Sequence, residues 1–294
     1  MKIYIINIIF IFLLIILFFY ICNLNINKPS HLKLNENYIN LNTNICCFYA
    51  YYEKNDLYKT NFEYFLENGI LANVDYYIII NGECSVNIPQ KDNIIIFRRE
   101  NKGYDFGAYS YAITKINKEY NYYFFINSSV KGPYLKNNKI PWVEYFLKLF
   151  KKNIKIVGTT INIHSNNFLD NYNLEEIYNK KEPFTHVQSM LFCINNEYLK
   201  YLNNIDFFNE EEMNNAPNIN YIIANKEIGL SQIALKNKWN INCILPYYKD
   251  LDYLKIHKDI NPTSLFGDSY YKNSYFGKTI NEYDVIFFKN NRFI

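Results

Sequence analysis

Two short polar loops contain the residues whose types and spacing could support chemistry. The first loop covers residues 101–107 and reads NKGYDFG, so that a carboxylate, Asp105, lies between Gly103 and Gly107. Glycine lets the backbone approach a ligand closely or adopt a positive φ, and a carboxylate accepts hydrogen bonds from hydroxyl and N–H groups. We predict that this loop, which begins at Asn101, cradles the diphosphate and the hydroxyl groups of a nucleotide-linked ligand. The alternative for Asp105 alone is a helix cap.

The second loop is Asn127-Ser128-Ser129, followed by Lys131 and a turn signal at residues 132–133. Its amide and hydroxyl groups can bind a ligand through hydrogen bonds, and the ammonium of Lys131 could stabilise a departing diphosphate. A serine-rich turn without a binding role is the alternative.

Two further residues are candidates for catalysis and binding. Glu227 stands at the start of a predicted helix, where a carboxylate either complements the helix dipole or, as a general base, takes a proton from an attacking hydroxyl. His186 precedes a predicted strand and could bind phosphate or metal; a structural histidine is the alternative. The sequence contains no P-loop, nucleophile elbow or zinc helix, so hydrolase and kinase functions have no motif to support them.

Alternating strands and helices must position these residues. Apolar runs of strand length occur at 44–51, 75–80, 93–97 and 122–126, with helical patterns at 61–68 and 106–120. Runs that are apolar throughout are typical of strands buried on both faces, which indicates a parallel, doubly wound sheet. Both polar loops would then lie at the carboxyl edge of that sheet, where α/β proteins bind nucleotides and small substrates.

The second half of the chain is less regular. Helical patterns occur at 142–150, 197–202 and 228–236, and strand patterns at 154–158, 190–194, 242–245 and 285–289. Residues 162–182 form a polar excursion without a clear period. Since no repeat or linker interrupts the pattern, we predict one catalytic-sized domain over residues 44–294.

The composition is that of a globular protein with a sizeable core. Of the 294 residues, 49% are hydrophobic and 20% are charged. The net charge is only +3 and no basic block occurs, so we exclude nucleic-acid binding. The six cysteines show no C-x-x-C pairing, which argues against a disulfide scaffold or a zinc site and leaves one long-range disulfide open.

The N-terminal segment has the character of a membrane anchor. Residues 3–22 are almost wholly apolar and long enough to cross the hydrocarbon core of a lipid bilayer. Because no small residues mark a cleavage site, we predict an uncleaved signal anchor over residues 1–24, rather than a cleaved signal or a buried core helix. Residues 25–43 are polar and typical of a stem.

Several motifs, in their order along the chain, resemble the glycosyltransferases related to rhamnan synthesis protein F. The resemblance runs from about residue 45 to the C-terminus, and its two most specific motifs are RRENKGYDFGAY at 98–109 and FINSSVKGP at 125–133. The supporting motifs are residues 157–162, 186–190, 227–232 and 283–289.

The resemblance implies a GT-A-like fold, with a mostly parallel open sheet and helices on both faces. It also implies transfer of a hexose or deoxyhexose from a nucleotide-sugar donor to a glycan or glycoconjugate acceptor. For such an enzyme we assign catalysis to Glu227 and Asp105, and donor binding to Asn101, Gly103, Asp105, Gly107, Asn127, Ser128, Ser129, Lys131 and His186. With its anchor, a eukaryotic protein of this kind would lie in the Golgi or ER membrane with a luminal catalytic domain.

One departure from the family pattern affects the expected cofactor. Relatives often carry an acid within the Asn-x-Ser motif, where this chain has Ser128. Neutral oxygens bind Mn²⁺ or Mg²⁺ more weakly than carboxylates do, so metal dependence is left open. Two alternatives follow: a catalytically inactive GT-A-like sugar-binding or scaffold protein, and a membrane-tethered structural protein whose glycines serve only turns.

Overall fold

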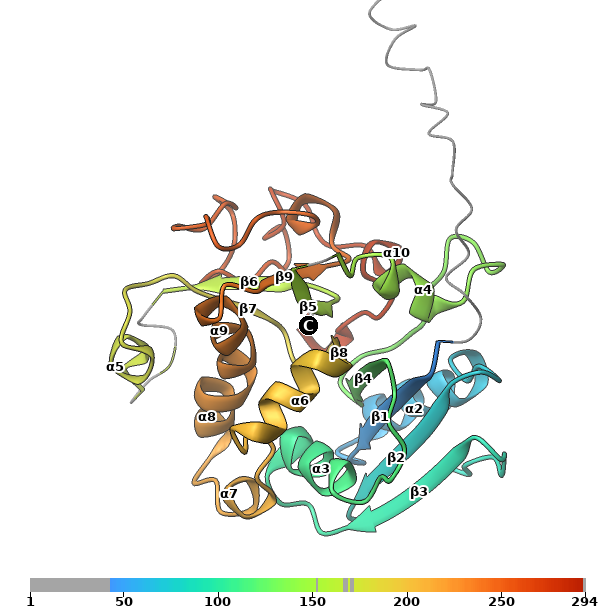
Figure 1. Cartoon of the computed structure of the whole chain (residues 1–294). Coiled ribbons are helices and arrows are strands. Elements are labelled where there is room, and N and C mark those ends of the chain that lie inside the picture. The colour runs from blue at the N-terminus through green and yellow to red at the C-terminus, as the bar shows by residue number, and fades with distance from the viewer. Residues whose placement is uncertain (1–42, 152, 166–168, 170–171, 293–294) are drawn as a thin grey trace, which may run out of the picture. The chain divides into compact units, whose positions relative to one another are not determined.

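A seven-stranded mixed sheet lies at the centre of the fold, with the strand order β3-β2-β1-β4-β8-β5-β9 (Figure 1). The computed structural model describes residues 43–151, 153–165, 169 and 172–292, so the predicted signal anchor and all but the last residue of the stem lie outside the described residues. The strands of this sheet are β1 (Ile45–Tyr51), β2 (Asp75–Asn81), β3 (Ile94–Arg99), β4 (Tyr122–Asn127), β5 (Ile154–Gly158), β8 (Leu191–Asn195) and β9 (Asn240–Cys243).

The sheet is mostly parallel rather than parallel throughout. Strands β1 to β4 pair in parallel, as do β5 and β9, but β8 runs antiparallel to both of its neighbours, β4 and β5. Only three residues, 188–190, link β7 (Phe184–Val187) to β8. They lie at the end of β4, where the Asn127 N–H donates to the Met190 carbonyl at 3.1 Å. Because β8 starts at the carboxyl end of β4, it runs antiparallel to β4; a parallel β8 would need a longer connection to the opposite edge of the sheet.

Helices cover both faces of the sheet, as the resemblance implies. Alternate residues of β1 point to opposite sides, and Tyr49 packs on Phe62 of α2 (Asp56–Asn68) with ring centroids 4.9 Å apart. On the other face, Tyr109 of α3 (Tyr104–Ile113) packs edge-on against Phe125 of β4 at 5.1 Å. Figure 1 shows α2 and α3 on opposite sides of the strands.

Helix boundaries differ from the predictions where capping decides them. Helix α2 begins at Asp56, five residues before the predicted start at Asn61, because the Asn55 side chain accepts the Tyr58 N–H at 3.2 Å. The remaining helices are α4 (Trp142–Leu147), α5 (Leu174–Tyr178), α6 (Asn196–Asn204), α7 (Glu210–Asn214), α8 (Ile219–Ile222), α9 (Gly229–Lys236) and α10 (Glu282–Val285), with a π-helix η2 (Ile223–Ile228) and 3₁₀ helices η3 (Pro246–Tyr248) and η4 (Asn290–Arg292).

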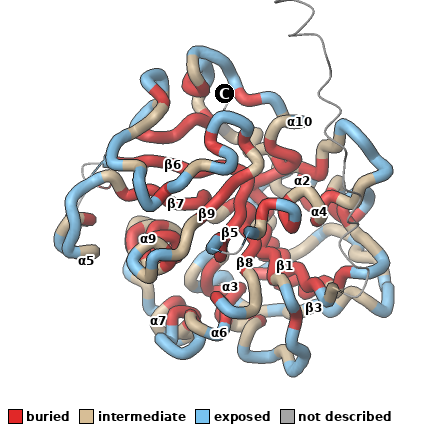
Figure 2. The backbone as a smooth tube through the Cα atoms, turned by 45° about the horizontal axis from the view of Figure 1, so that its top comes forward, coloured by how far each residue is buried: buried red, intermediate tan, exposed pale blue. Residues whose placement is uncertain are grey.

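The predicted polar excursion is wrong, because the segment contains buried structure. Strand β6 (Ile161–His164) pairs antiparallel with β7 in a second, two-stranded sheet. Every residue of both strands is buried (Figure 2). Their polar side chains are covered by the segment that contains Gly267, whose carbonyl accepts the Ile163 N–H at 3.1 Å. Because several of the buried residues in these strands are polar, the hydropathy pattern of the sequence does not predict either strand.

The strand predicted at 285–289 is also wrong. Helix α10 ends at Val285, and Ile286 adopts a positive φ of 65°, which breaks an extended path. Only one isolated bridge follows, between Phe288 and Lys131 of the loop after β4.

All five cysteines within the described part of the chain are free thiols: Cys46, Cys47, Cys84, Cys193 and Cys243.

Among the helices within the described residues, none has both the length and the apolar character that a bilayer crossing requires. The predicted anchor lies outside these residues.

Candidate active site

A cavity of about 660 Å³ opens at the carboxyl edge of β1, β2 and β4. Its walls include six of the residues that the sequence singles out: Asn101, Asp105, Asn127, Ser128, Ser129 and Glu227. The remaining lining residues are Ala50, Tyr52, Lys54, Tyr58, Asn81, Tyr104, Ser189, Ile219, Ile222, Ile223 and Lys289. Four other predicted residues, Gly103, Gly107, Lys131 and His186, are not part of this lining.

Asp105 and Asn127 join the two polar loops directly. The Asn127 side-chain amide donates to Asp105 Oδ2 at 2.8 Å, and the Phe106 N–H donates to Asp105 Oδ1 at 3.0 Å. Burial raises the pKa of Asp105 to about 6, the hydrogen bond from Asn127 opposes that rise, and the charge of Glu227 adds to it. Asp105 therefore both stabilises the start of α3 and presents a readily protonated carboxylate to the cavity.

The two glycines shape the first loop instead of lining the cavity. Gly103 has a φ of +69°, and a Cβ there would come within 2.6 Å of the Met213 carbonyl oxygen. A Cβ at Gly107 would lie 2.3 Å from the Lys102 carbonyl oxygen. Both positions require glycine for close backbone packing, which explains their spacing without a ligand.

Arg99, at the end of β3, holds this loop in place. Its guanidinium donates to Asn81 Oδ1 at 2.9 Å, to the Lys102 carbonyl at 2.9 Å and to Asn214 Oδ1 at 2.7 Å. Three acceptors on three elements match the fixed fork of an arginine. Arg99 lies within the 98–109 motif, but its type alone gives no sign of this positioning role.

The side-chain oxygens at the end of β4 are engaged in hydrogen bonds within the protein. Asn127 Oδ1 accepts the Ser129 N–H at 3.0 Å and the Ser129 hydroxyl at 2.6 Å. The Ser128 hydroxyl exchanges hydrogen bonds of 3.4 Å with the Tyr52 backbone. The loop is thus preorganised, as an Asx turn, beside the cavity.

Glu227 does not begin a helix. It lies within the continuous helical segment α8-η2-α9, in the π-helical part, so the first-turn dipole role does not apply. Its Oε1 accepts the Ser189 N–H at 3.0 Å, and the side chain lines the cavity. Short π-helical segments inside α-helices are frequent at functional sites.

Further polar contacts fix α9 against β7 and thereby orient Glu227. The Val187 N–H donates to Ser231 Oγ at 2.9 Å, and the Gln232 amide donates to the Thr185 carbonyl at 2.7 Å. The two supporting motifs at 186–190 and 227–232 therefore form one structural unit.

His186 belongs to a buried histidine pair and has a structural role. Its ring lies 5.0 Å from that of His164, and its Nδ1 is 2.9 Å from the Phe184 carbonyl. Burial lowers the pKa of His186, against the influence of the Glu227 charge. Direct contact of His186 with a ligand in the cavity finds no support in this arrangement.

Lys289 is a half-buried cation of the cavity wall that the sequence analysis missed. Lys131 instead places its ammonium 4.9 Å from the centre of the Tyr64 ring, while its backbone pairs with Phe288 and so brings Lys289 into the wall. Burial lowers the pKa of Lys289, and the carboxylates Glu227 and Asp105 raise it in opposition. Lys289 ends the supporting motif at 283–289, and that position was its only sequence signal.

Aromatic and aliphatic side chains complete the walls. Tyr52 and Tyr104 are exposed at 42% each, and Tyr58 is half-buried. Together with Ile219, which is 43% exposed, they offer flat apolar surfaces of the kind that stack on bases or sugar rings. None of these residues stood out in a chain with 30 tyrosines.

The loop after β4 does not fit a divalent metal. Among the described residues, no group of three or more His, Cys, Asp or Glu side chains could hold a metal ion. The side-chain oxygens of residues 127–129 are neutral, and Asn127 Oδ1 already accepts two protein hydrogen bonds. The Lys289 ammonium shares the wall with the two carboxylates, Asp105 and Glu227. Mg²⁺ and Mn²⁺ favour carboxylate oxygens, and residues 127–129 provide none.

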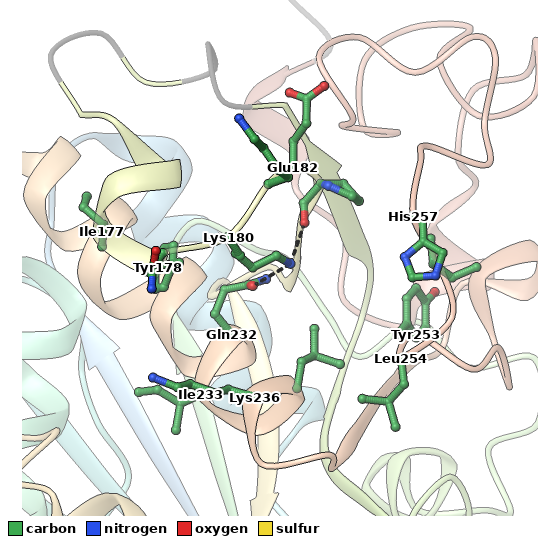
Figure 3. A pocket seen from close by; sticks show the side chains of 15 residues that line it. Ile177, Tyr178, Lys180, Glu182, Gln232, Ile233, Lys236, Tyr253, Leu254 and His257 are labelled. Carbon is green, nitrogen blue, oxygen red and sulfur yellow. Dashed lines mark hydrogen bonds between the residues drawn. The ribbon is translucent and has the colours of Figure 1, made fainter.

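A second cavity, of about 500 Å³, lies between α5, α9 and residues 253–257 (Figure 3). The Lys180 ammonium there donates to the Pro183 carbonyl at 3.0 Å and to Gln232 Oε1 at 3.2 Å. Glu182 is the carboxylate in the lining of this cavity, and its side chain extends away from Lys180 and Gln232. Because none of the predicted residues lines this cavity, we assign no chemistry to it.

Comparison with known proteins yields structural neighbours only. No family model matches this chain, and no curated protein does. The chain is similar to a solved glycosyltransferase involved in glycosylation of the major capsid of PBCV-1, with 13% identity, a TM-score of 0.34, and coverage of 63% of this chain and 76% of that one. It is also similar to the mannosyltransferase Ktr4p from S. cerevisiae, solved with GDP, with 9% identity, a TM-score of 0.39, and coverage of 69% of each chain. A third neighbour is the mannosyltransferase PcManGT from Pyrobaculum calidifontis, solved with GDP-Man and Mn²⁺, with 8% identity, a TM-score of 0.34, and coverage of 54% of this chain and 46% of that one.

The class of fold therefore rests on the chain's own topology, since these TM-scores are low. The mostly parallel seven-stranded sheet with helices on both faces fits a GT-A fold. The finer relation to rhamnan synthesis protein F stays a prediction from the motifs.

Proposed function

We propose that this protein is a glycosyltransferase, which moves a hexose or deoxyhexose from a nucleotide-sugar donor to a glycan or glycoconjugate acceptor. The observation that carries the proposal is the meeting of Asp105, Asn127 and Glu227 at one cavity, although they come from three separate motifs. Its volume of about 660 Å³ suits a small-molecule ligand. The motif resemblance supports the same activity independently of the cavity.

The donor would bind against the first two loops. Asp105 would accept hydrogen bonds from sugar or ribose hydroxyls, and Asn101 and Ser129 offer further polar groups. The exposed rings of Tyr52 and Tyr104 provide surfaces for the base.

Glu227 would act as the general base of an inverting transfer. Its Oε1 is held by the Ser189 N–H at 3.0 Å, while no hydrogen bond to its Oε2 occurs within the described residues. Oε2 would take the proton of the acceptor hydroxyl while the oxygen of that hydroxyl bonds to the anomeric carbon. The bond between the anomeric carbon and the diphosphate breaks at the same time, and its electron pair leaves with the diphosphate. A retaining reaction would not need this base.

The activity is tested by a thermal-shift screen with UDP, GDP, dTDP and their sugars. A nucleotide present at 100 times its Kd stabilises the folded state by about 2.7 kcal/mol, so we expect one base to raise the Tm clearly. Hydrolysis of the matching nucleotide sugar is then measured, with water as the acceptor. If no nucleotide raises the Tm, the donor site is refuted.

The absence of an acidic pair after β4 favours one alternative, an inactive GT-A-like sugar-binding or scaffold protein. Residues 127–129 are Asn, Ser and Ser. Nucleotide binding without any donor hydrolysis or transfer would support this alternative over the enzyme.

We further propose that residues 3–22 anchor the protein in a membrane as a single-pass span, with the catalytic domain luminal in the Golgi or ER if the host is eukaryotic. The support is the length and apolar character of this segment. We expect the full chain to stay in the membrane pellet after alkaline carbonate washing, and a chain of residues 43–294 to be released. Release of the full chain would refute the anchor.

A further inference from the structure

The cavity contains an ammonium group whose charge is not neutralised by a direct partner. Two cations line it, Lys54, which is exposed, and Lys289, which is half-buried. Lys289 makes no ion pair within the part of the chain that the structure describes. The charges of Glu227 and Asp105, which line the same cavity, raise the pKa of Lys289 against the effect of burial. An anion in the cavity would therefore find a preformed positive charge.

The backbone on both sides of Lys289 is anchored. Before it, Phe288 exchanges backbone hydrogen bonds of 2.9 and 2.8 Å with Lys131. After it, the Asn290 amide donates to Asn61 Oδ1 at 3.2 Å. These contacts tie the end of the chain to the loop after β4 and to α2. The position of Lys289 is thus built into the fold, as preorganised electrostatic stabilisation requires.

The neutral β4 loop leaves a role for such a charge. A departing nucleoside diphosphate gains negative charge, which must be balanced by a metal ion, by N–H groups or by basic side chains. Asn127, Ser128 and Ser129 supply no negative charge to hold a metal, and Lys131 points to Tyr64. Lys289 is the half-buried cation that remains on the wall described here.

We propose that Lys289 binds the diphosphate of the donor and stabilises it as it departs, in the role that a divalent cation would otherwise have. This inference rests on the proposed function. As the bond from the anomeric carbon to the diphosphate oxygen breaks, the electron pair stays on that oxygen, and the Lys289 ammonium offsets the new charge without transferring a proton. The proton of the acceptor hydroxyl goes to Glu227, so the step balances.

The test is calorimetric titration of the full chain with the nucleoside diphosphate that stabilises it, and with the corresponding monophosphate, both in EDTA. We expect wild type to bind the diphosphate in EDTA. We expect Lys289→Gln to weaken diphosphate binding at least tenfold and monophosphate binding less, and Lys289→Arg to restore most of the loss. Lys148→Gln is the matched control, because the Lys148 ammonium pairs with Glu144 at 3.3 Å beside α4, outside the cavity lining, and we expect less than a threefold change.

The outcomes separate the two proposals. If wild type binds the diphosphate only after Mn²⁺ replaces EDTA, or if Lys289→Gln binds it as wild type does, the role of Lys289 is refuted while the donor site stands. If wild type binds neither nucleotide with or without Mn²⁺, the proposed function itself fails. An unchanged Tm of unliganded Lys289→Gln shows that the variant is folded.

Discussion

Replacing Glu227 with glutamine is expected to reduce sugar transfer by about a hundred- to ten-thousandfold, the range that a general base contributes. The amide keeps the size of the side chain and an oxygen that can accept the Ser189 N–H, now at 3.0 Å from Glu227 Oε1. It cannot take the proton of the acceptor hydroxyl. Nucleotide affinity should therefore stay within about threefold of wild type while turnover is lost.

The measurement is kcat for hydrolysis of the nucleotide sugar that raises the Tm, together with the Kd of its nucleoside diphosphate. Glu144→Gln is the matched control, since Glu144 pairs with Lys148 on the surface of α4, where such pairs contribute little. Turnover at the wild-type level in Glu227→Gln would remove Glu227 as the base and would favour a retaining reaction.

The sequence predicted the first half of the fold because its signals are local. Continuous apolar runs such as residues 75–80 specify strands buried on both faces, and parallel strands bring their carboxyl ends to one edge. This geometry alone put Asp105 and Asn127 near each other, and the structure joins them by a hydrogen bond of 2.8 Å.

The second half depends on partners that are distant in the sequence. Strands β6 and β7 bury Asn162, His164 and His186, which no hydropathy pattern assigns to an interior. The Asn162 amide nitrogen lies 3.2 Å from His164 Nε2, and His164 Nδ1 contacts the carbonyl of Phe266, about a hundred positions later in the chain. A polar core of this kind becomes visible only when both partners are placed.

The candidate site was predictable by residue type but not by role. Gly103 and Gly107 resemble ligand-binding glycines, yet each leaves room for protein backbone, at Met213 and at Lys102. The sequence cannot separate these two uses of a missing Cβ. Lys289 was missed because its place at the cavity depends on a bridge between Phe288 and Lys131, which are 157 positions apart. The local sequence around Lys289 predicts only a strand.

Replacing Asp105 with asparagine is expected to weaken donor binding about ten- to a hundredfold at pH 7.5 and to remove its pH dependence. Hydrogen bonds to charged groups contribute about 1.5–3 kcal/mol, and each 1.4 kcal/mol is tenfold in affinity. Burial raises the pKa of Asp105 to about 6 from a usual value of 3.8. In wild type the carboxylate therefore gains a proton as the pH falls through about 6, and donor affinity should fall with it.

The effect on stability has the opposite sign. Because the folded protein binds this proton more tightly than the unfolded chain, the Asp105 contribution to the free energy of unfolding rises as the pH falls from about 7 towards 4. Unliganded Asp105→Asn should lack this contribution to the pH profile of unfolding. The opposite slopes of donor affinity and stability distinguish titration of Asp105 at the site from general acid unfolding, which would lower both.

The probe for this experiment is the nucleotide sugar, since a terminal phosphate monoester has its own pKa near 6 and a sugar-capped diphosphate does not carry one. Kd is measured from pH 5 to pH 8 for wild type, for Asp105→Asn and for Asp284→Asn, whose carboxylate pairs with Lys136 outside the cavity lining. Asp284→Asn should follow the wild-type curve. A wild-type affinity that is flat over this range and equal to that of Asp105→Asn would show that Asp105 does not contact the donor, because a carboxylate that shares a hydrogen bond with the ligand cannot be neutralised without a change in affinity.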